Sequence, residues 1–205
     1  MPPKKTNGGN LNDPLLKLPY AGTYRKIPKT TIVRNSSAIA PYQKQASVQA
    51  LRSFLPSDAA MRQKNYKSAQ RLPEEEHNVQ VDAFIYAIKI EVKTSPTGSG
   101  DNDFHVIIGD KPKNLQRLIN AEVAGLPASS AKDYNALLAA RQQLIDIFPN
   151  VKLSSSYYIP PAPIPVTVKG SVYFDGDHNP NTIGAPGTKP QTVWEIHPVT
   201  SIVKR

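Results

Sequence analysis

The sequence predicts a mainly β fold, a small five-stranded barrel with one helix between its third and fourth strands and a basic N-terminal extension. Five segments after residue 73 show the period-2 alternation of side chains that is typical of a strand. One amphipathic helical stripe separates the third from the fourth. The charge changes at the same boundary: residues 1–72 hold 13 Lys or Arg and two Asp, a net charge of +11, whereas residues 73–205 hold 12 basic and 14 acidic residues, a net charge of −2.

Residues 1–72 are expected to form a basic, largely extended or disordered arm with one or two short helices. Up to about residue 41 the arm is rich in Pro, Gly, Asn and Lys and lacks a sustained period. Apolar residues between 45 and 55 suit one short helix, and Ser57 can cap a second that runs to about residue 69. Neither helix has enough apolar surface to fold alone.

The first three strands follow the acidic turn at residues 73–77. Residues 79–92 form one long strand, and its apolar residues change parity near Ala87, which predicts a bulge there. Residues 103–108 and 118–123 form the second and third strands. A long, bent first strand is what a small curled barrel requires.

The helix is expected to begin after Ser130, because Asp133 follows at the spacing of a capping box. Its apolar stripe runs from Tyr134 to Phe148, and Pro149 ends it. The helix should plug the barrel.

The last two strands are residues 166–174 and 192–203. In the final strand Trp194 and Ile196 share one face while Glu195 and His197 share the other, so one face can be core and the other can hold chemistry. Pro198 lacks an amide donor and predicts a bulge or an unpaired position. Three strands, a helix and two strands is the order of an OB-like Greek-key barrel, expected here over residues 73–205.

Three short segments support the same domain. They are Asp101–His105 (DNDFH), Phe174–His178 (FDGDH) and Glu195–Val199 (EIHPV). With these motifs the chain resembles a set of mostly bacterial OB-fold-like hypothetical proteins that carry a DxDFH strand, an FDxxH strand end and a final (E/L)xHPV strand. The resemblance covers about residues 78–205 and omits the arm. That set has no assigned activity, so the resemblance implies the barrel and names no reaction.

Three of the four histidines fall in these segments, with carboxylates beside them. Imidazole and carboxylate together suit a divalent metal ion, the candidate cofactor, which polarises a phosphoester or activates water. The spacing matches no known catalytic motif, and His105 on a strand can equally be a hydrogen-bonded structural residue. A metal-dependent nuclease or phosphoesterase is therefore one hypothesis, and whether the chain is an enzyme stays open. The candidate cluster is Asp103, His105, Asp175, His178, Glu195 and His197.

The leading hypothesis from the sequence is a binding module that holds nucleic acid with low sequence specificity. Aromatic residues interleaved with cations can stack on bases and neutralise phosphates. The alternative is a structural adaptor whose arm docks on a protein partner. The candidate nucleic-acid contacts are Tyr20, Tyr24, Arg25, Lys26, Lys29 and Arg34 in the arm and Tyr157 and Tyr173 in the barrel.

Several classes of function lack support in the sequence. The absence of cysteine excludes a disulfide framework, a thiolate metal site and a cysteine nucleophile. Phosphate-binding, dinucleotide-binding, serine-hydrolase and zincin motifs are also missing. No apolar run approaches the roughly 20 residues of a membrane span, and the start of the chain has no signal-peptide pattern, so no membrane partner and a cytoplasmic location are expected.

Overall fold

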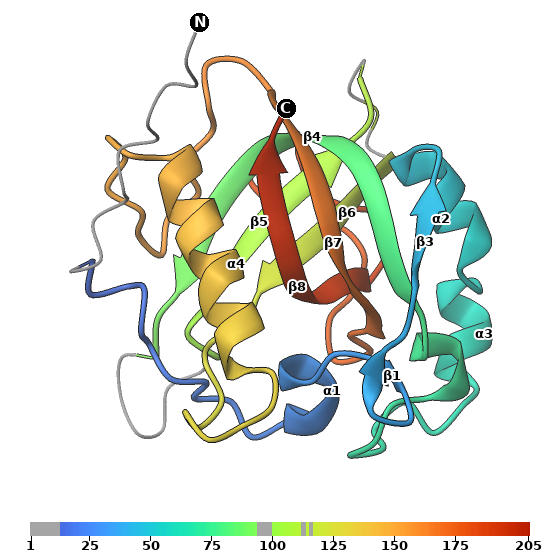
Figure 1. Cartoon of the computed structure of the whole chain (residues 1–205). Helices are drawn as coiled ribbons and strands as arrows, with labels where there is room; N and C mark the ends of the chain where they lie inside the picture. Colours follow the sequence, from blue (N-terminus) through green and yellow to red (C-terminus); the bar gives the residue numbers. More distant parts are fainter. Residues whose placement is uncertain (1–12, 94–99, 112–113, 115–116) are drawn as a thin grey trace, which may run out of the picture.

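A computed structural model describes residues 13–93, 100–111, 114 and 117–205, and it shows a closed five-stranded mixed β-barrel (Figure 1). The predicted order is confirmed: β4 pairs with β5, β5 with β6, β6 with β8 and β8 with β7, and β7 returns to β4. Only the β6–β8 pair of the barrel is parallel. The barrel elements are β4 (Asn78–Glu91), β5 (Asp103–Gly109), β6 (Leu118–Val123), α4 (Tyr134–Ile147), β7 (Ile164–Phe174) and β8 (Trp194–Lys204).

Both predicted strand irregularities are present. The register of β4 against β5 shifts between Ile85 and Ala87. The register of β7 against β8 shifts on both sides of Gly170, next to Pro198. A Cβ on Gly170 would lie 2.5 Å from the Pro198 backbone oxygen, so only glycine permits this approach. Such bulges bend their strands and increase the local twist, which helps a short sheet to curl closed.

The helix α4 begins later than the capping pattern predicted. It starts at Tyr134, and Asp133 precedes it without making a side-chain cap. The Asp133 carboxylate instead accepts a hydrogen bond of 3.0 Å from the Ile32 amide and pairs with Arg34. A tertiary contact with the N-terminal segment therefore replaces the expected local one. Buried residues of α4 join the barrel core, and the helix packs beside β8 (Figure 1).

Residues 13–72 are more ordered than the sequence predicted. The two expected helices are present, although the second ends at Arg62 and not near residue 69. The strand β3 pairs in parallel with the start of β4 and extends the sheet. Residues 1–12 of the predicted arm lie outside the described residues. The elements of this segment are α1 (Lys26–Thr30), β1 (Arg34–Asn35), β2 (Ala38–Ile39), β3 (Tyr42–Gln45), α2 (Val48–Phe54) and α3 (Asp58–Arg62).

This N-terminal segment and the barrel share one apolar core. Val48, Leu51 and Met61 are completely buried in the same cluster as the inward side chains of the barrel strands. The short helices α2 and α3 thus gain from the barrel the apolar partner that they lack alone. A domain boundary at residue 72 stays a prediction, but the core runs across it. None of the helices in the described ranges is long and apolar enough to cross a membrane.

A buried ion pair joins the N-terminal segment to the barrel. Two nitrogens of the Arg25 guanidinium each lie 2.7 Å from a Glu75 carboxylate oxygen, and both side chains are 0% exposed. Glu75 ends the short 3-10 helix η1 (Pro73–Glu75) and also accepts a 2.9 Å hydrogen bond from the Phe174 amide at the end of β7. One carboxylate therefore connects α1, η1 and β7.

We expect the Glu75→Gln substitution to lower the free energy of unfolding by about 3–5 kcal/mol, because it leaves the Arg25 charge buried without its partner. The neighbouring Glu74 is the matched control. It pairs with Lys64, whose side chain is 45% exposed. Glu74→Gln should cost less than about 1 kcal/mol. Urea unfolding of both variants measures the difference, and equal losses would contradict the role given to the Arg25–Glu75 pair.

Candidate metal centre

Alternation along the strands of the barrel separates an apolar inner face from a polar outer face. In β5, Phe104, Val106 and Ile108 belong to the core, and Asp103 and His105 point to the opposite side. The strand register then brings polar residues together. His105 is paired with Glu122 of β6, Asn120 with Glu195 of β8, and Glu195 with Tyr173 of β7. A polar row thus crosses four neighbouring strands.

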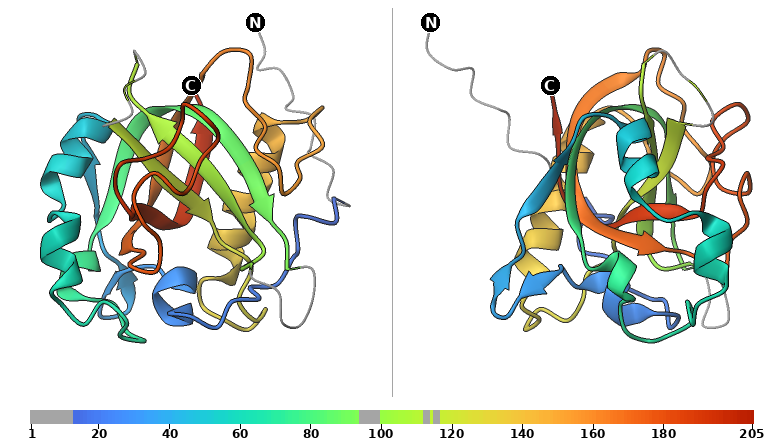
Figure 2. Two further views of the ribbon diagram at one scale, coloured as in Figure 1. Left: turned by 180° about the vertical axis from the view of Figure 1, so that it is seen from behind. Right: turned by 90° about the vertical axis from the view of Figure 1, so that its right-hand side faces the viewer.

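This outer face is covered. The loop between β7 and β8 passes in front of β5 and β6 when the barrel is seen from behind (Figure 2, left). Its residue Ala185 packs with Ile107 and Leu118 of those strands, and its Gly184 amide donates a 3.0 Å hydrogen bond to the Tyr157 hydroxyl. The polar row is consequently removed from water. The exposed fractions are 1% for Asp103, 3% for His105, 1% for Glu122, 1% for Glu195 and 0% for His197.

Glu122 lies between the two buried imidazoles. Its Oε2 atom is 2.7 Å from His197 Nδ1, and its Oε1 atom is 3.3 Å from His105 Nε2. His105 Nε2 is also 3.3 Å from Asp103 Oδ1 and 3.6 Å from Glu91 Oε2. His197 Nδ1 is 3.6 Å from Glu195 Oε2. We call Glu91, Asp103, His105, Glu122, Glu195 and His197 the outer-face cluster.

Electrostatic coupling within this cluster is strong. Burial raises the pKa of Asp103 to about 6 and that of Glu195 to about 7, and the neighbouring Glu122 charge adds to both shifts. Burial opposes charge on Glu122 too, but His105 and His197 hold the pKa of Glu122 well below its usual range. Against the same burial penalty, Glu122 and the adjacent carboxylates raise the pKa of His197 to about 9. The carboxylates thus attract positive charge into a buried site.

Several buried polar atoms of the cluster lack a well-aligned hydrogen bond. Among the residues that the structure describes, these atoms include Glu122 Oε2, Glu195 Oε2 and both ring nitrogens of His197. Folded proteins leave few such atoms, and a gathering of them calls for an ion, a water or a ligand. Imidazole nitrogens and carboxylate oxygens are ligands of divalent transition metals. In each of two trios, Glu91–Asp103–His105 and Asp103–Glu122–His197, ligand atoms lie within 4.8 Å of one another.

Asp175 and His178 form a second polar group at the solvent edge. His178 Nδ1 lies 3.1 Å from Asp175 Oδ2, and the His178 side chain is 41% exposed. With Glu195 they make a third trio of candidate ligands. Lys29 of α1 approaches from the other side, 2.9 Å from Asp101 and 3.6 Å from Asp175. The structure therefore gathers all six candidate cluster residues of the sequence into two adjoining groups that share Glu195.

The candidate nucleic-acid contacts have different surroundings from those expected. Arg25 and Lys29 are buried in the ion pairs described above, and their cationic groups lie 4.9 Å and 5.5 Å from the centre of the buried Tyr173 ring. The buried Tyr20 hydroxyl donates a 3.1 Å hydrogen bond to Asp101. These four side chains face the interior and offer no surface for bases. Tyr24 and Tyr157 are half-buried, Arg34 pairs with Asp133, and Lys26 is exposed.

Sequence reasoning missed two members of the outer-face cluster, Glu91 and Glu122. A signal for Glu122 was present, because Asn120 and Glu122 share one parity of a strand whose other parity is apolar. Glu91 ends the first barrel strand between Lys89 and Lys93, so the sequence pattern did not distinguish it from an ordinary row of surface charges. Asn120 was also missed, and it donates hydrogen bonds to both Glu122 (2.7 Å) and Glu195 (3.0 Å).

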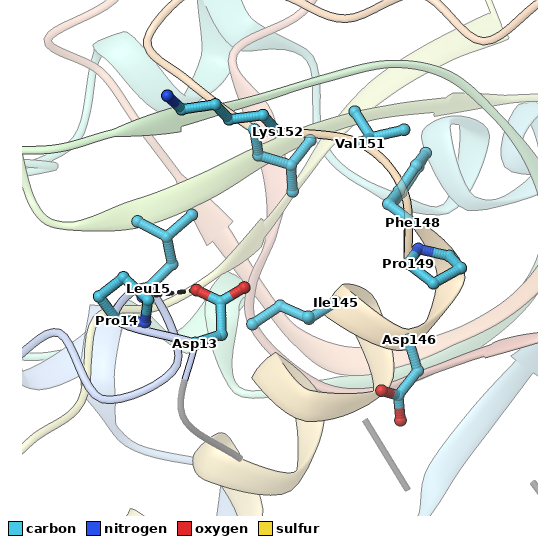
Figure 3. Close-up of a pocket in the computed structure, with 10 residues that line it drawn as sticks. Asp13, Pro14, Leu15, Ile145, Asp146, Phe148, Pro149, Val151 and Lys152 are labelled. Carbon is cyan, nitrogen blue, oxygen red and sulfur yellow. Dashed lines mark hydrogen bonds between the residues drawn. The ribbon is translucent and has the colours of Figure 1, made fainter. Parts of the chain in front are cut away.

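A pocket of about 400 Å³ lies away from the cluster, between the end of α4 and the start of the described chain (Figure 3). Its walls are largely apolar, with Leu15, Ile145 and Phe148 among them. Asp13 accepts a 2.8 Å hydrogen bond from the Leu15 amide and so serves the local turn. The lining includes no histidine. The pocket therefore has carboxylates but lacks the imidazoles that the outer face of the barrel brings together.

Comparison of the chain with models of protein families, with curated proteins and with solved structures finds no match in any of the three. The resemblance to mostly bacterial OB-fold-like proteins accordingly stays a prediction from the motifs. The function is therefore inferred from the residues of the outer face.

In the metal-free protein, kept in a chelator, we expect the His178 imidazole to titrate near pH 9. The close contact with the Asp175 carboxylate is the main cause that raises the pKa of His178 from 6.5 to about 9. A pKa raised by folding stabilises the protein fully below pH 6.5, and this contribution is lost as the pH rises through about 9. Ring chemical shifts measured by NMR report the titration. Asp175→Asn should return it toward 6.5, and an unchanged midpoint in that variant would refute the assignment to Asp175.

Proposed function

We propose that this chain is a metal-binding protein that holds a divalent ion in the outer-face cluster. The observation that carries the proposal is the pair of buried imidazoles, His105 and His197, enclosed by four carboxylates. A buried charge network by itself is weak support for stability, because desolvation of each charge costs several kcal/mol. A bound cation gives these groups a partner whose attraction offsets that cost.

The donor set favours a particular class of metal. Mixed nitrogen and oxygen ligands suit Zn²⁺, Mn²⁺, Fe²⁺ or Co²⁺, whereas Mg²⁺ and Ca²⁺ prefer oxygen alone. His105, His197 and Glu122 are the central ligand candidates because their ligand atoms face one another at 2.7 Å and 3.3 Å. Asn120 supports them by holding the Glu122 and Glu195 carboxylates with its amide. Such supporting hydrogen bonds orient metal ligands.

Hydrolysis of a phosphoester is the reaction that we assign to this centre. A divalent ion, when bound, supplies Lewis acidity that polarises a phosphoryl oxygen and lowers the pKa of water. His178 is the group of this region that reaches solvent and is paired with a carboxylate, so it is suited to carry a proton to or from a substrate. Glu91, 36% exposed, marks a second edge where the cluster approaches the surface.

The net charge of +9 favours a polyanionic substrate, which makes nucleic acid the substrate class of first choice. The exposed Lys26 and the half-buried Tyr24 and Tyr157 stay candidates for contacts with it. Two competing hypotheses explain the same positive charge. In one the chain binds nucleic acid without cleaving it, and in the other the N-terminal segment docks on a protein partner.

Metal binding should appear as stabilisation. At an ion concentration 100 times the dissociation constant, the wild type should gain about 2.7 kcal/mol of unfolding free energy. Both His105→Gln and His197→Gln should lose most of this gain. His77→Gln is the matched control, because His77 contacts Gln43 and Phe54 away from the cluster. Thermal melts with and without Zn²⁺ or Mn²⁺, together with elemental analysis, provide the measurement. The same response in all four proteins would refute the site.

Phosphoester hydrolysis is tested separately with bis(p-nitrophenyl) phosphate and a single-stranded oligonucleotide. We expect metal-loaded wild type to cleave both, and His178→Ala to lose about 100-fold in kcat at unchanged metal content, as for the loss of a general acid or base. His77→Ala should keep full activity. A metal-loaded wild type that binds the oligonucleotide but never cleaves it would reduce the function to binding.

A further inference from the structure

Building on the proposed metal site, we propose that the outer-face cluster is a two-metal centre in which Glu122 and Asp103 bridge two divalent ions. The central observation is the orientation of Glu122. Its two carboxylate oxygens face two different imidazoles, Oε1 toward His105 at 3.3 Å and Oε2 toward His197 at 2.7 Å. A carboxylate shared in this way between two nitrogen ligands is arranged to bridge two ions.

Asp103 is shared as well. It belongs both to the trio with Glu91 and His105 and to the trio with Glu122 and His197. Each imidazole also has a carboxylate of its own. Glu91 lies 3.6 Å from His105, and Glu195 lies 3.6 Å from His197. The cluster therefore divides into two similar halves, each with one imidazole and one private carboxylate, joined by two common carboxylates.

The formal charge of the cluster accommodates one or two ions. The four carboxylates carry four negative charges, and Lys89, 3.3 Å from Glu91, supplies one positive charge at the exposed edge. Lys29 is already paired with Asp101 and Asp175. With neutral imidazole ligands, one divalent ion leaves the buried carboxylates with net negative charge, which a low-dielectric site penalises. With the Lys89 charge included, one divalent ion leaves a net charge of −1 and two ions leave +1, so the second ion is favoured where an anionic phosphoester supplies the remaining negative charge.

The two halves differ in their distance from water. His197 is 0% exposed and Glu195 1%, so an ion held there is enclosed. Glu91 is 36% exposed, so an ion beside it lies near the surface. The ion at the Glu91 half should therefore exchange faster. A pair of ions joined by common ligands also suits the proposed phosphoester chemistry, because two metals stabilise the attacking and the leaving oxygens together.

The test is to load metal-free full-length protein with Mn²⁺ and measure the ions bound per chain by elemental analysis after dialysis. We expect two ions in the wild type and an exchange-coupled electron paramagnetic resonance signal. Glu91→Gln should retain one ion with an uncoupled six-line signal. Asp146→Asn is the matched control, because Asp146 is exposed on α4 and hydrogen-bonded only to Gln142 among its described contacts; it should retain two coupled ions.

The outcomes separate the two proposals. A single ion in the wild type, or two ions without exchange coupling, would overturn the bridged centre and leave the metal-binding function standing. No bound ion would overturn both. If circular dichroism shows that Glu91→Gln is unfolded, the stoichiometry and the spectrum of the wild type still decide the question.

Discussion

Both faces of β5 and β6 are buried, and this burial dictates what the other segments of the chain have to provide. Every residue of these two strands is buried. In most antiparallel sheets one face packs on the core and the other meets water. Here the outer face carries His105 and Glu122, so covering it places charge in a low-dielectric region. The remaining segments of the chain must then supply both the cover and the compensating charge.

The N-terminal segment supplies cations to acidic residues that lie outside the outer-face cluster. Lys29 pairs with Asp101 and Asp175, and Arg25 pairs with Glu75. Arg71 is half-buried and donates a 2.8 Å hydrogen bond to the Val172 backbone oxygen of β7. The excess positive charge before residue 72 and the excess negative charge after it are therefore partly paired with each other inside the protein. Part of the positive charge that predicted the binding of an external polyanion instead neutralises acidic residues of the protein itself.

The loop that covers the outer face also limits which molecules can contact the cluster. Its centre at His197 is fully buried, while Glu91 and His178 lie at two partly exposed edges. Glu91 and His178 are the groups of this region that solvent reaches, one at the end of β4 and the other in the loop between β7 and β8.

Local sequence patterns were enough to predict the barrel, because alternation, bulge residues and helix stripes depend only on residues close together in the chain. The five strands and the irregularities at Ala87 and Pro198 lie close to where those patterns predicted them, and α4 lies between the predicted strands but begins later than its capping pattern indicated. The motif histidines and their adjacent acids were identified for the same reason. Glu122 was recognisable only by its parity, since nothing local showed that its strand would lie between those of His105 and His197.

Tertiary structure alone decided which charges are buried. Lys29 and Asp101 are 72 residues apart and Arg25 and Glu75 are 50 apart, so no local period connects them. The same holds for Asp133, whose capping position predicted a local role but whose carboxylate binds the Ile32 amide. The alternation of residues along a strand predicts on which side of the strand each side chain lies. Whether that side meets water depends on segments far away in the chain, and here they covered it.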